Sequence, residues 1–170
     1  MIRESSEKDL KDILEIYNDA ILNTTSIYAY KIQNLEEKKQ WYEKKKQDGY
    51  PLIVFEESGR VVGFATFGPF REWPAYKYTI EHSIYVHKDY RNKGIATRLM
   101  KEIIKIANER EYATLVAGID AANEVSIKMH EKMGFKYSGK VTKAGFKFGK
   151  WLDLAFYQLN LAGPQMPLEE

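Results

Sequence analysis

The chain has 170 residues, and its 26 Lys and Arg against 24 Asp and Glu leave a formal net charge of only +2 at pH 7. This near-neutral balance argues against a nucleic-acid partner, and the short basic run Lys44-Lys45-Lys46 is better explained as a solvated helix face. The absence of cysteine excludes disulfides, zinc–thiolate sites and a cysteine nucleophile. With no leader-like segment and no apolar run near the ~20 residues of a membrane span, we expect a cytoplasmic protein without a membrane partner.

The first elements along the chain are predicted to be two helices. Ser6 followed by Asp9 is typical of a helix start, and apolar residues then recur at helical spacing through residues 10–21. Asn34 with Glu37 three positions later predicts the start of the second helix. The aromatic and polar stretch between the two helices is interpreted as an irregular connection.

The rest of the chain alternates strands with two more helices. Strands are expected at residues 52–55, 61–67, 78–86, 114–119, 135–137 and 151–159, and helices at 94–110 and 124–133. Residues 57–60 form a turn signal, and residues 144–149 are expected to be a loop. The pattern predicts one mixed α/β sheet domain at 1–162, followed by a flexible tail at 163–170.

A candidate anion site lies where the strand containing Ile84, Tyr85 and Val86 runs through a polar turn into a long helix. Such a loop directs backbone N–H groups and the positive end of a helix dipole at one spot. The residues of this candidate cradle for a pyrophosphate are Arg91, Asn92, Lys93, Gly94, Ile95, Ala96 and Thr97. The pattern is neither a P-loop nor a dinucleotide fingerprint, and spacing alone leaves open an ordinary strand-to-helix turn on a basic surface.

Several motifs resemble a known family. Arg91-x-x-Gly94-x-Ala96 after the strand is similar to the acetyl-CoA signature of the Gcn5-related N-acetyltransferases (GNAT), and Asn123-x-x-Ser126 with the segment 129–135 is similar to a later motif of that superfamily. Segments at 68–71, 75–76, 79–86, 128–131 and 144–153 are most similar to the phosphinothricin and methionine sulfoximine acetyltransferases. The resemblance implies a GNAT-type acyl-CoA acyltransferase fold, with a mixed, mostly antiparallel central sheet flanked by helices.

The resemblance also implies acetyl-CoA as co-substrate. Ile84 to Val86 would offer backbone groups to the pantetheine arm, residues 91–97 would hold the pyrophosphate, and Asn123 and Ser126 would contact the arm from the other side. The implied reaction is acetylation of the amine of a small amino-acid-like substrate by direct attack in a ternary complex.

Aminolysis of a thioester needs a base for the ammonium and an acid for the departing thiolate. Glu81 lies on an otherwise apolar or neutral strand, where desolvation raises a carboxylate pKa, and the subfamily's catalytic glutamate falls at this position. His130 is seven residues after Asn123, where the wider superfamily usually has tyrosine and this subfamily has histidine. Which of Glu81 and His130 moves the substrate proton stays open. His82 and His87 are interpreted as bystanders, and no metal site is expected.

Arg71 is a candidate clamp for a substrate carboxylate, because a guanidinium binds carboxylates through paired hydrogen bonds and the subfamily has a basic residue here. Further substrate-binding candidates are Phe70, Tyr76, Thr79, Tyr28 and Tyr30, with Trp73 as another possible pocket wall. The resemblance implies a homodimer in which the loop 144–150 helps close the site. The alternatives are acetylation of a protein or peptide amine and a non-catalytic acyl-CoA-binding module.

Overall fold

The computed structural model describes all residues from Met1 to Glu170. The chain forms two compact units: one combines Met1–Gly68 with Ser83–Ile103, and the other combines Pro69–His82 with Ile104–Glu170. Strand β4 (Thr79–Val86) and helix α3 (Ile95–Glu109) each contribute residues to both units. The strands follow the order β1-β2-β3-β4-β5-β7-β6 in a mixed α/β fold of the predicted class. The prediction of a single domain at 1–162 stays a prediction.

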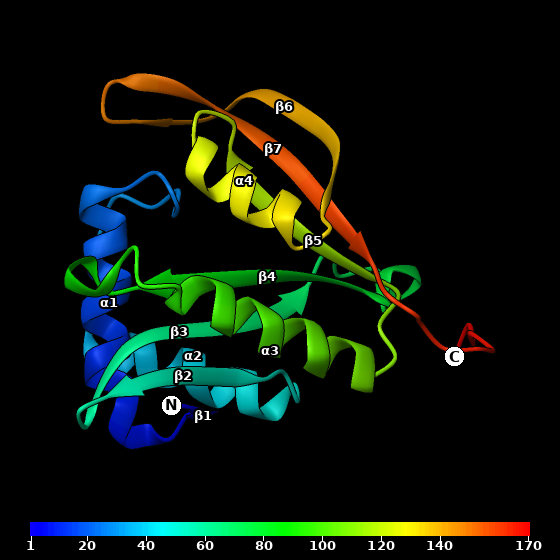
Figure 1. Ribbon diagram of the computed structural model, residues 1–170, viewed down its shortest axis with the longest axis horizontal. Coiled ribbons are helices and arrows are strands. Elements are labelled where there is room, and N and C mark those ends of the chain that lie inside the picture. The colour runs from blue at the N-terminus through cyan, green and yellow to red at the C-terminus, as the bar shows by residue number, and fades with distance from the viewer. The chain divides into compact units, whose positions relative to one another are not determined.

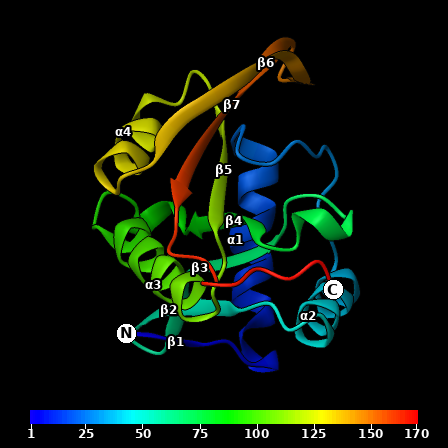
Figure 2. The same cartoon turned by 90° about the vertical axis from the view of Figure 1, so that its right-hand side faces the viewer.

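The first unit contains the helices and strands of the N-terminal part (Figure 1). Its elements are β1 (Ile2–Glu4), the short 3-10 helix η1 (Glu7–Asp9), α1 (Leu10–Asn23), α2 (Leu35–Gln47), β2 (Leu52–Glu57), β3 (Arg60–Pro69) and η3 (Lys88–Tyr90), with the second half of β4 and the first half of α3. β1, β2 and β3 pair antiparallel. α1 and α2 lie on one face of these strands and α3 lies on the other (Figures 1 and 2).

Both predicted helix starts are confirmed. The Ser6 amide donates to the Asp9 carboxylate at 2.7 Å, and the Asn34 side chain accepts from the Glu37 amide at 2.9 Å in a reciprocal capping box. The sequence analysis missed strand β1, which has only three residues and pairs with residues 53–55 of β2. Three residues are too few to show the alternation of apolar and polar side chains that predicts a strand. Pairing with β2 therefore decides the conformation of this segment.

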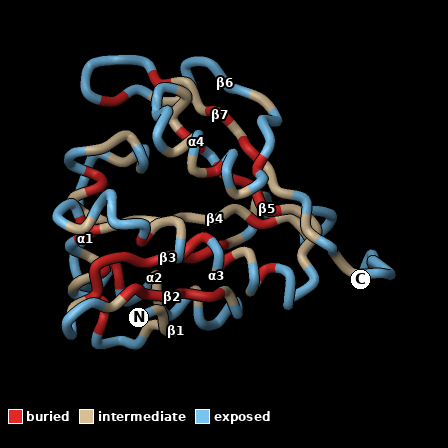
Figure 3. The backbone as a smooth tube through the Cα atoms, in the orientation of Figure 1, coloured by how far each residue is buried: buried red, intermediate tan, exposed pale blue.

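The core of the first unit is formed by α1 against strands β2 and β3, whose tubes are largely buried in Figure 3. On the other face of β3, Gly63 lets α3 approach closely: a Cβ at this position would lie 3.1 Å from the Ile95 side chain and 3.2 Å from that of Leu99. This contact positions the N-terminus of α3, which is the end of the candidate cradle.

The second unit contains the first half of β4, the short helix η2 (Pro74–Tyr76), the second half of α3, β5 (Thr114–Asp120), α4 (Glu124–Lys132), β6 (Lys136–Lys147) and β7 (Lys150–Asn160). β4 pairs parallel with β5, while β7 pairs antiparallel with both β5 and β6. Helix α4 covers one face of β5 and β7 (Figures 1 and 2).

The prediction of a loop at residues 144–149 was wrong. Residues 144–147 continue β6 and pair with β7, and the hairpin turns at Phe148 and Gly149, which both have positive φ. The two strands shift register between Val141 and Gly145, and such an irregular pairing disguises the strand pattern in the sequence.

The tail beyond residue 162 makes a contact within the second unit. The Tyr78 hydroxyl accepts a hydrogen bond from the Leu168 amide at 2.9 Å. The flexibility of the tail stays a prediction. No helix of the chain combines the length and the apolar character needed to cross a bilayer.

Candidate functional site

The strand-to-helix loop in the first unit has the backbone geometry of an anion cradle. After β4 and η3 the chain passes through Asn92 with φ 62° and Gly94 with φ 75°, and α3 begins at Ile95. No atom lies within 4 Å of where a Gly94 Cβ would be, so the positive φ rather than a tight contact favours glycine here. Because the first four N–H groups of a helix have no intrahelical partner, this end of α3 offers donors to an anion. The residues therefore fit a diphosphate.

The two cations of the cradle are held differently. The Arg91 guanidinium forms an ion pair with Asp19 of α1 at 3.3 Å, and its Nε donates to the Val86 carbonyl at 3.3 Å. Lys93 is exposed and lies over the Tyr90 ring, with Nζ 4.7 Å from the ring centroid. Arg91 thus braces the loop against α1, while Lys93 can approach an incoming phosphate.

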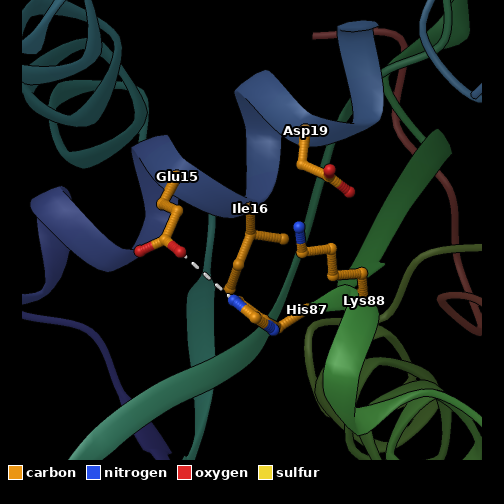
Figure 4. A pocket seen from close by; sticks show the side chains of 5 residues that line it. All are labelled: Glu15, Ile16, Asp19, His87 and Lys88. Atoms are coloured by element: carbon orange, nitrogen blue, oxygen red, sulfur yellow. Dashed lines mark hydrogen bonds and ion pairs between the residues drawn. The ribbon is translucent and has the colours of Figure 1, made fainter. Parts of the chain in front are cut away.

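His87 has a structural contact, and its interpretation as a bystander in the chemistry stays a prediction. Its Nδ1 accepts from the Asp89 amide at 3.2 Å, and its Nε2 lies 3.2 Å from a Glu15 carboxylate oxygen (Figure 4). His87 lines a cavity of about 100 Å³ together with Glu15, Ile16, Asp19 and Lys88. This cavity is too small to hold a coenzyme. We therefore interpret the residues that line it as a support for the loop.

The residues predicted to meet the pantetheine arm can contribute mainly through their backbone. The Tyr85 ring packs in the core of the first unit, 5.2 Å from the Phe64 ring and 5.9 Å from the Tyr17 ring. Ile84 and Val86 are half-buried on either side of it. A side chain anchored in this way leaves main-chain groups as the ones that can meet a ligand.

Glu81 of β4 lies in the second unit above a glycine of the neighbouring strand. A Cβ on Gly118 of β5 would be 3.5 Å from the Glu81 Oε1 and 3.9 Å from the Phe156 ring. Burial raises the pKa of Glu81, and the positive charge of Arg71 opposes that increase. Glu81 therefore has the properties predicted for a base: it is half-buried and its proton affinity is enhanced.

Three of the predicted substrate residues gather in the same unit as Glu81. The Phe70 ring lies 6.0 Å from the Tyr76 ring and 6.2 Å from the Phe156 ring. The Arg71 guanidinium lies 4.3 Å above the Phe70 ring and donates to the Phe70 carbonyl at 2.8 Å. An exposed guanidinium beside a half-buried carboxylate and aromatic rings can hold a zwitterionic amino acid.

The other predicted substrate residues are divided between the units. The Thr79 carbonyl accepts from the Phe70 amide at 3.3 Å, and Thr79 lies two residues before Glu81, so its side chain shares that face of β4. Trp73 is exposed in the second unit. Tyr28 and Tyr30 belong to the first unit, where both are exposed in the connection between α1 and α2.

His130 is buried on α4 with both ring nitrogens engaged. Its Nδ1 lies 2.7 Å from the Ser126 carbonyl oxygen, and its Nε2 lies 3.1 Å from the Nε2 of His82 on β4. The two imidazoles stack with centroids 5.2 Å apart and planes at 11°. Burial lowers the pKa of His130, and burial together with the neighbouring His130 lowers the pKa of His82 to about 3. The sequence analysis missed this contact, because a strand and a helix separated by 48 residues supply the partners.

Asn123 and Ser126 have a local structural role. The Asn123 side chain accepts from the Ser126 amide at 3.1 Å and so caps the N-terminus of α4. Their spacing of three residues is what an N-cap requires. Their predicted contact with the coenzyme arm stays a prediction.

The sequence analysis also missed Gly118, which lies beside Glu81, and Phe156, whose ring lies beside Gly118. The register Glu81↔Val116 between parallel strands places Gly118 nearby, and only the pairing of β4 with β5 reveals it. A glycine inside a predicted strand, which often marks a close approach, is the one signal in the sequence. No cluster of three or more His, Cys, Asp or Glu side chains is arranged to hold a metal ion.

Comparisons with known proteins agree with this arrangement. Residues 10–135 match the model of the Acetyltransferase (GNAT) family. An L-methionine sulfoximine/L-methionine sulfone acetyltransferase from Pseudomonas paraeruginosa is 40% identical over 161 residues, which are 94% of this chain and 94% of that protein. The chain therefore belongs to the acetyltransferase (GNAT) family and is an N-acetyltransferase.

Two solved structures share the fold along almost their whole length. A GNAT superfamily phosphinothricin acetyltransferase from Sinorhizobium meliloti in complex with AcCoA is 32% identical, with a TM-score of 0.93 over 98% of this chain and 91% of that one. A ribosomal-protein-alanine N-acetyltransferase from Brucella melitensis is 43% identical, with a TM-score of 0.93 over 95% of this chain and 99% of that one. Among these similar proteins, the names include both amino-acid and protein substrates.

Proposed function

We propose that this protein transfers the acetyl group of acetyl-CoA to the α-amine of a small amino-acid-like substrate of the methionine sulfoximine or phosphinothricin type. The observation that carries the proposal is Glu81 in the second unit: a half-buried carboxylate with a raised pKa, whose proton affinity the exposed Arg71 moderates. The names of the similar acetyltransferases support the choice of substrate class.

In the proposed complex, the main-chain N–H groups at the start of α3 bind the diphosphate of acetyl-CoA, and Lys93 adds a positive charge. Bound acetyl-CoA supplies the activated acetyl group as a thioester. Arg71 binds the substrate carboxylate, and the Phe70 and Tyr76 rings pack against the substrate side chain.

Glu81 and His130 are the proposed proton-handling residues. Because an ammonium has no lone pair, it must lose a proton before its nitrogen can attack the thioester carbonyl carbon. Glu81 is suited to accept protons from nitrogen, since desolvation brings its pKa closer to the working pH. With no cysteine in the chain, the amine attacks the thioester directly in a ternary complex and no acetyl-cysteine enzyme forms.

We propose that the protein acts as a homodimer in the cytoplasm. The β6–β7 hairpin exposes Phe146, Phe148 and Trp151, with Phe148 and Trp151 each more than half exposed. Exposed aromatic side chains gathered on one hairpin are typical of a protein interface.

A second candidate function is acetylation of a protein amine. The name of the Brucella relative favours this function, and the exposure of Arg71, Trp73 and Tyr76 is compatible with a larger substrate.

An assay of thiol release from acetyl-CoA with a panel of amines separates the two candidates. We expect turnover with methionine sulfoximine and phosphinothricin at a kcat/KM at least ten times that for peptides with an N-terminal alanine or an internal lysine. The reverse order would favour the protein substrate. No thiol release with any amine would contradict both.

A further inference from the structure

The cradle is an exposed loop whose shape depends on how its two ends are held. At the far end, α3 packs closely against Gly63 of β3 through the side chains of Ile95 and Leu99. At the near end, the loop follows the single short turn of η3, and residues 91–94 are exposed. Binding is weakened when an exposed loop must first be ordered by its ligand. The contacts that fix η3 therefore contribute to the affinity for a diphosphate.

Polar contacts rather than close packing connect η3 to α1. A cavity of about 100 Å³, lined by residues of both elements, lies between them (Figure 4). Asp19 of α1 forms the ion pair with Arg91 at 3.3 Å. Glu15, one turn earlier on the same face of α1, lies 3.2 Å from the Nε2 of His87. These two carboxylates hold the segment that leads into the cradle.

The proton position on His87 can be deduced from its two contacts. A backbone N–H only donates, so the Nδ1 that accepts from the Asp89 amide at 3.2 Å carries no proton. In the neutral ring the proton is then on Nε2, which donates to the Glu15 carboxylate. Burial works to raise the pKa of Glu15, but hydrogen bonds from His87 and Arg60 hold that pKa below its usual value. An ionised Glu15 is thus the acceptor, and one imidazole bridges η3 and α1.

We propose that His87 is a positioning residue for coenzyme binding, which holds η3 and the start of the cradle on α1 through Glu15. The inference rests on the proposed function, because it needs the diphosphate of acetyl-CoA at the start of α3. Both ring nitrogens of His87 are engaged, so the residue acts on the coenzyme through the loop and does not touch it.

The surroundings of His87 make it the fixed half of this link. Its side chain is 6% exposed, whereas that of Glu15 is 54% exposed. The His87 amide donates to the Val62 carbonyl of β3 at 2.8 Å, so the sheet holds the residue in place. The His87 ring also packs edge-on against the Tyr90 ring at 5.6 Å, and the Lys93 Nζ lies 4.7 Å from the centroid of that second ring. His87 therefore supports a cation of the cradle as well as its backbone.

The variant H87N separates the link to α1 from the local turn. The asparagine Oδ1 can still accept from the Asp89 amide, but the shorter side chain cannot reach Glu15. We expect the KM for acetyl-CoA to rise about fivefold, with kcat and the KM for the amine changed less than about twofold. A purely structural loss would lower the folded fraction, and so the apparent kcat, without changing either KM. An H87N enzyme with the parent KM for acetyl-CoA would overturn the proposal.

E15A and R60Q are a matched pair of variants on the other side of the link. E15A removes the acceptor of the His87 proton and should raise the KM for acetyl-CoA as H87N does, which tests the link even if H87N fails to fold. R60Q breaks only the exposed ion pair between Arg60 and Glu15 and should keep the parent KM. In the double variant H87N/E15A the KM should be no higher than in the worse single variant. If the two increases multiply, or if R60Q matches E15A, the proposal is wrong.

Two measurements on the parent distinguish this inference from the proposed function. In calorimetry with CoA, a parent that binds no CoA would contradict the proposed function and the role of His87 together. A parent that binds CoA no more tightly than H87N and E15A would contradict the role of His87 alone. In the ¹⁵N NMR spectrum of the histidine rings, neutral His87 should carry its proton on Nε2. A proton on Nδ1 would contradict the link to Glu15 whatever the kinetics of the variants.

Discussion

The cradle at residues 91–97 and the cluster of titratable side chains Glu81, His82 and His130 on β4 and α4 differ in how they are built. The cradle is one continuous segment, largely exposed around residues 91–94, and it relies on two left-handed residues and a helix N-terminus. The cluster combines side chains from β4 and α4 that are buried or half-buried.

This difference reflects two kinds of chemistry. Binding of a diphosphate uses main-chain dipoles, which have the same strength in any loop of the right shape. Proton transfer near neutral pH needs side chains with altered pKa values, and burial by distant parts of the chain produces the shifts at Glu81 and His82. A mutation in the cradle should therefore affect binding, whereas one in the cluster should affect turnover.

Among the variants that test this comparison, E81Q is expected to show the largest effect. Loss of the base should lower kcat about 10²- to 10⁴-fold, while calorimetry should find the acetyl-CoA affinity unchanged. In the parent, kcat/KM should decrease as the pH is lowered through the pKa of Glu81. Because burial raises that pKa, the decrease should begin at a higher pH than for an ordinary glutamate. A variant as fast as the parent would show that Glu81 is not the base.

A smaller effect is expected for G94A, which places a side chain on a residue with φ 75°. Strain of about 1–2 kcal/mol should distort the loop and raise the KM for acetyl-CoA about tenfold. The matched control is G59A, at a turn residue with φ 78° and equally open space. The control should lose similar stability and keep the parent KM. Equal KM values for both variants would argue against the cradle.

The site around Glu81 can be probed from the facing strand with G118V and G118A. The alanine Cβ would make ordinary contacts of 3.4 Å to Leu154 and 3.5 Å to the Glu81 carboxylate, so kcat should change less than twofold. The larger valine side chain should displace the carboxylate and reduce kcat about fivefold, measured at saturating acetyl-CoA. Equal kcat values for G118A and G118V would show that turnover does not require the Glu81 carboxylate in its position beside Gly118.

The smallest effect concerns stability alone and is expected for D9N. Asp9 accepts from Arg3 at 2.8 and 2.9 Å and from the Ser6 amide at 2.7 Å, and Arg3 lowers the pKa of Asp9. Asparagine should cost about 1–2 kcal/mol of unfolding free energy at pH 7, measured in urea. The lowered pKa means that this stabilisation is present above the unfolded-state pKa of about 4 and is lost as the pH falls further. A difference in unfolding free energy between D9N and the parent that grows as the pH is lowered would contradict this account. The kcat of D9N should equal that of the parent.

The sequence predicted much of the fold because the relevant signals are local. Ser6 with Asp9 and Asn34 with Glu37 are helix starts in the structure, and the turn between β2 and β3 lies at Ser58 and Gly59 as expected. The loop that leads into α3 has positive φ at Asn92 and Gly94, and this conformation likewise depends on a few adjacent residues. Strand β1 and the continuation of β6 through residues 144–147 were missed, since pairing with a neighbouring strand defines both.

By itself the sequence determined the family, the helix starts and the backbone conformation at the N-terminus of α3. Capping and positive φ depend on adjacent residues, so the sequence records them directly. Only the tertiary structure decided which side chains surround Glu81 and that the His82 ring contacts the His130 ring. Gly118 and His130 reach β4 through strand pairing and helix packing. Proton affinities depend on such neighbours, so the chemistry of the site follows from contacts that no local pattern records.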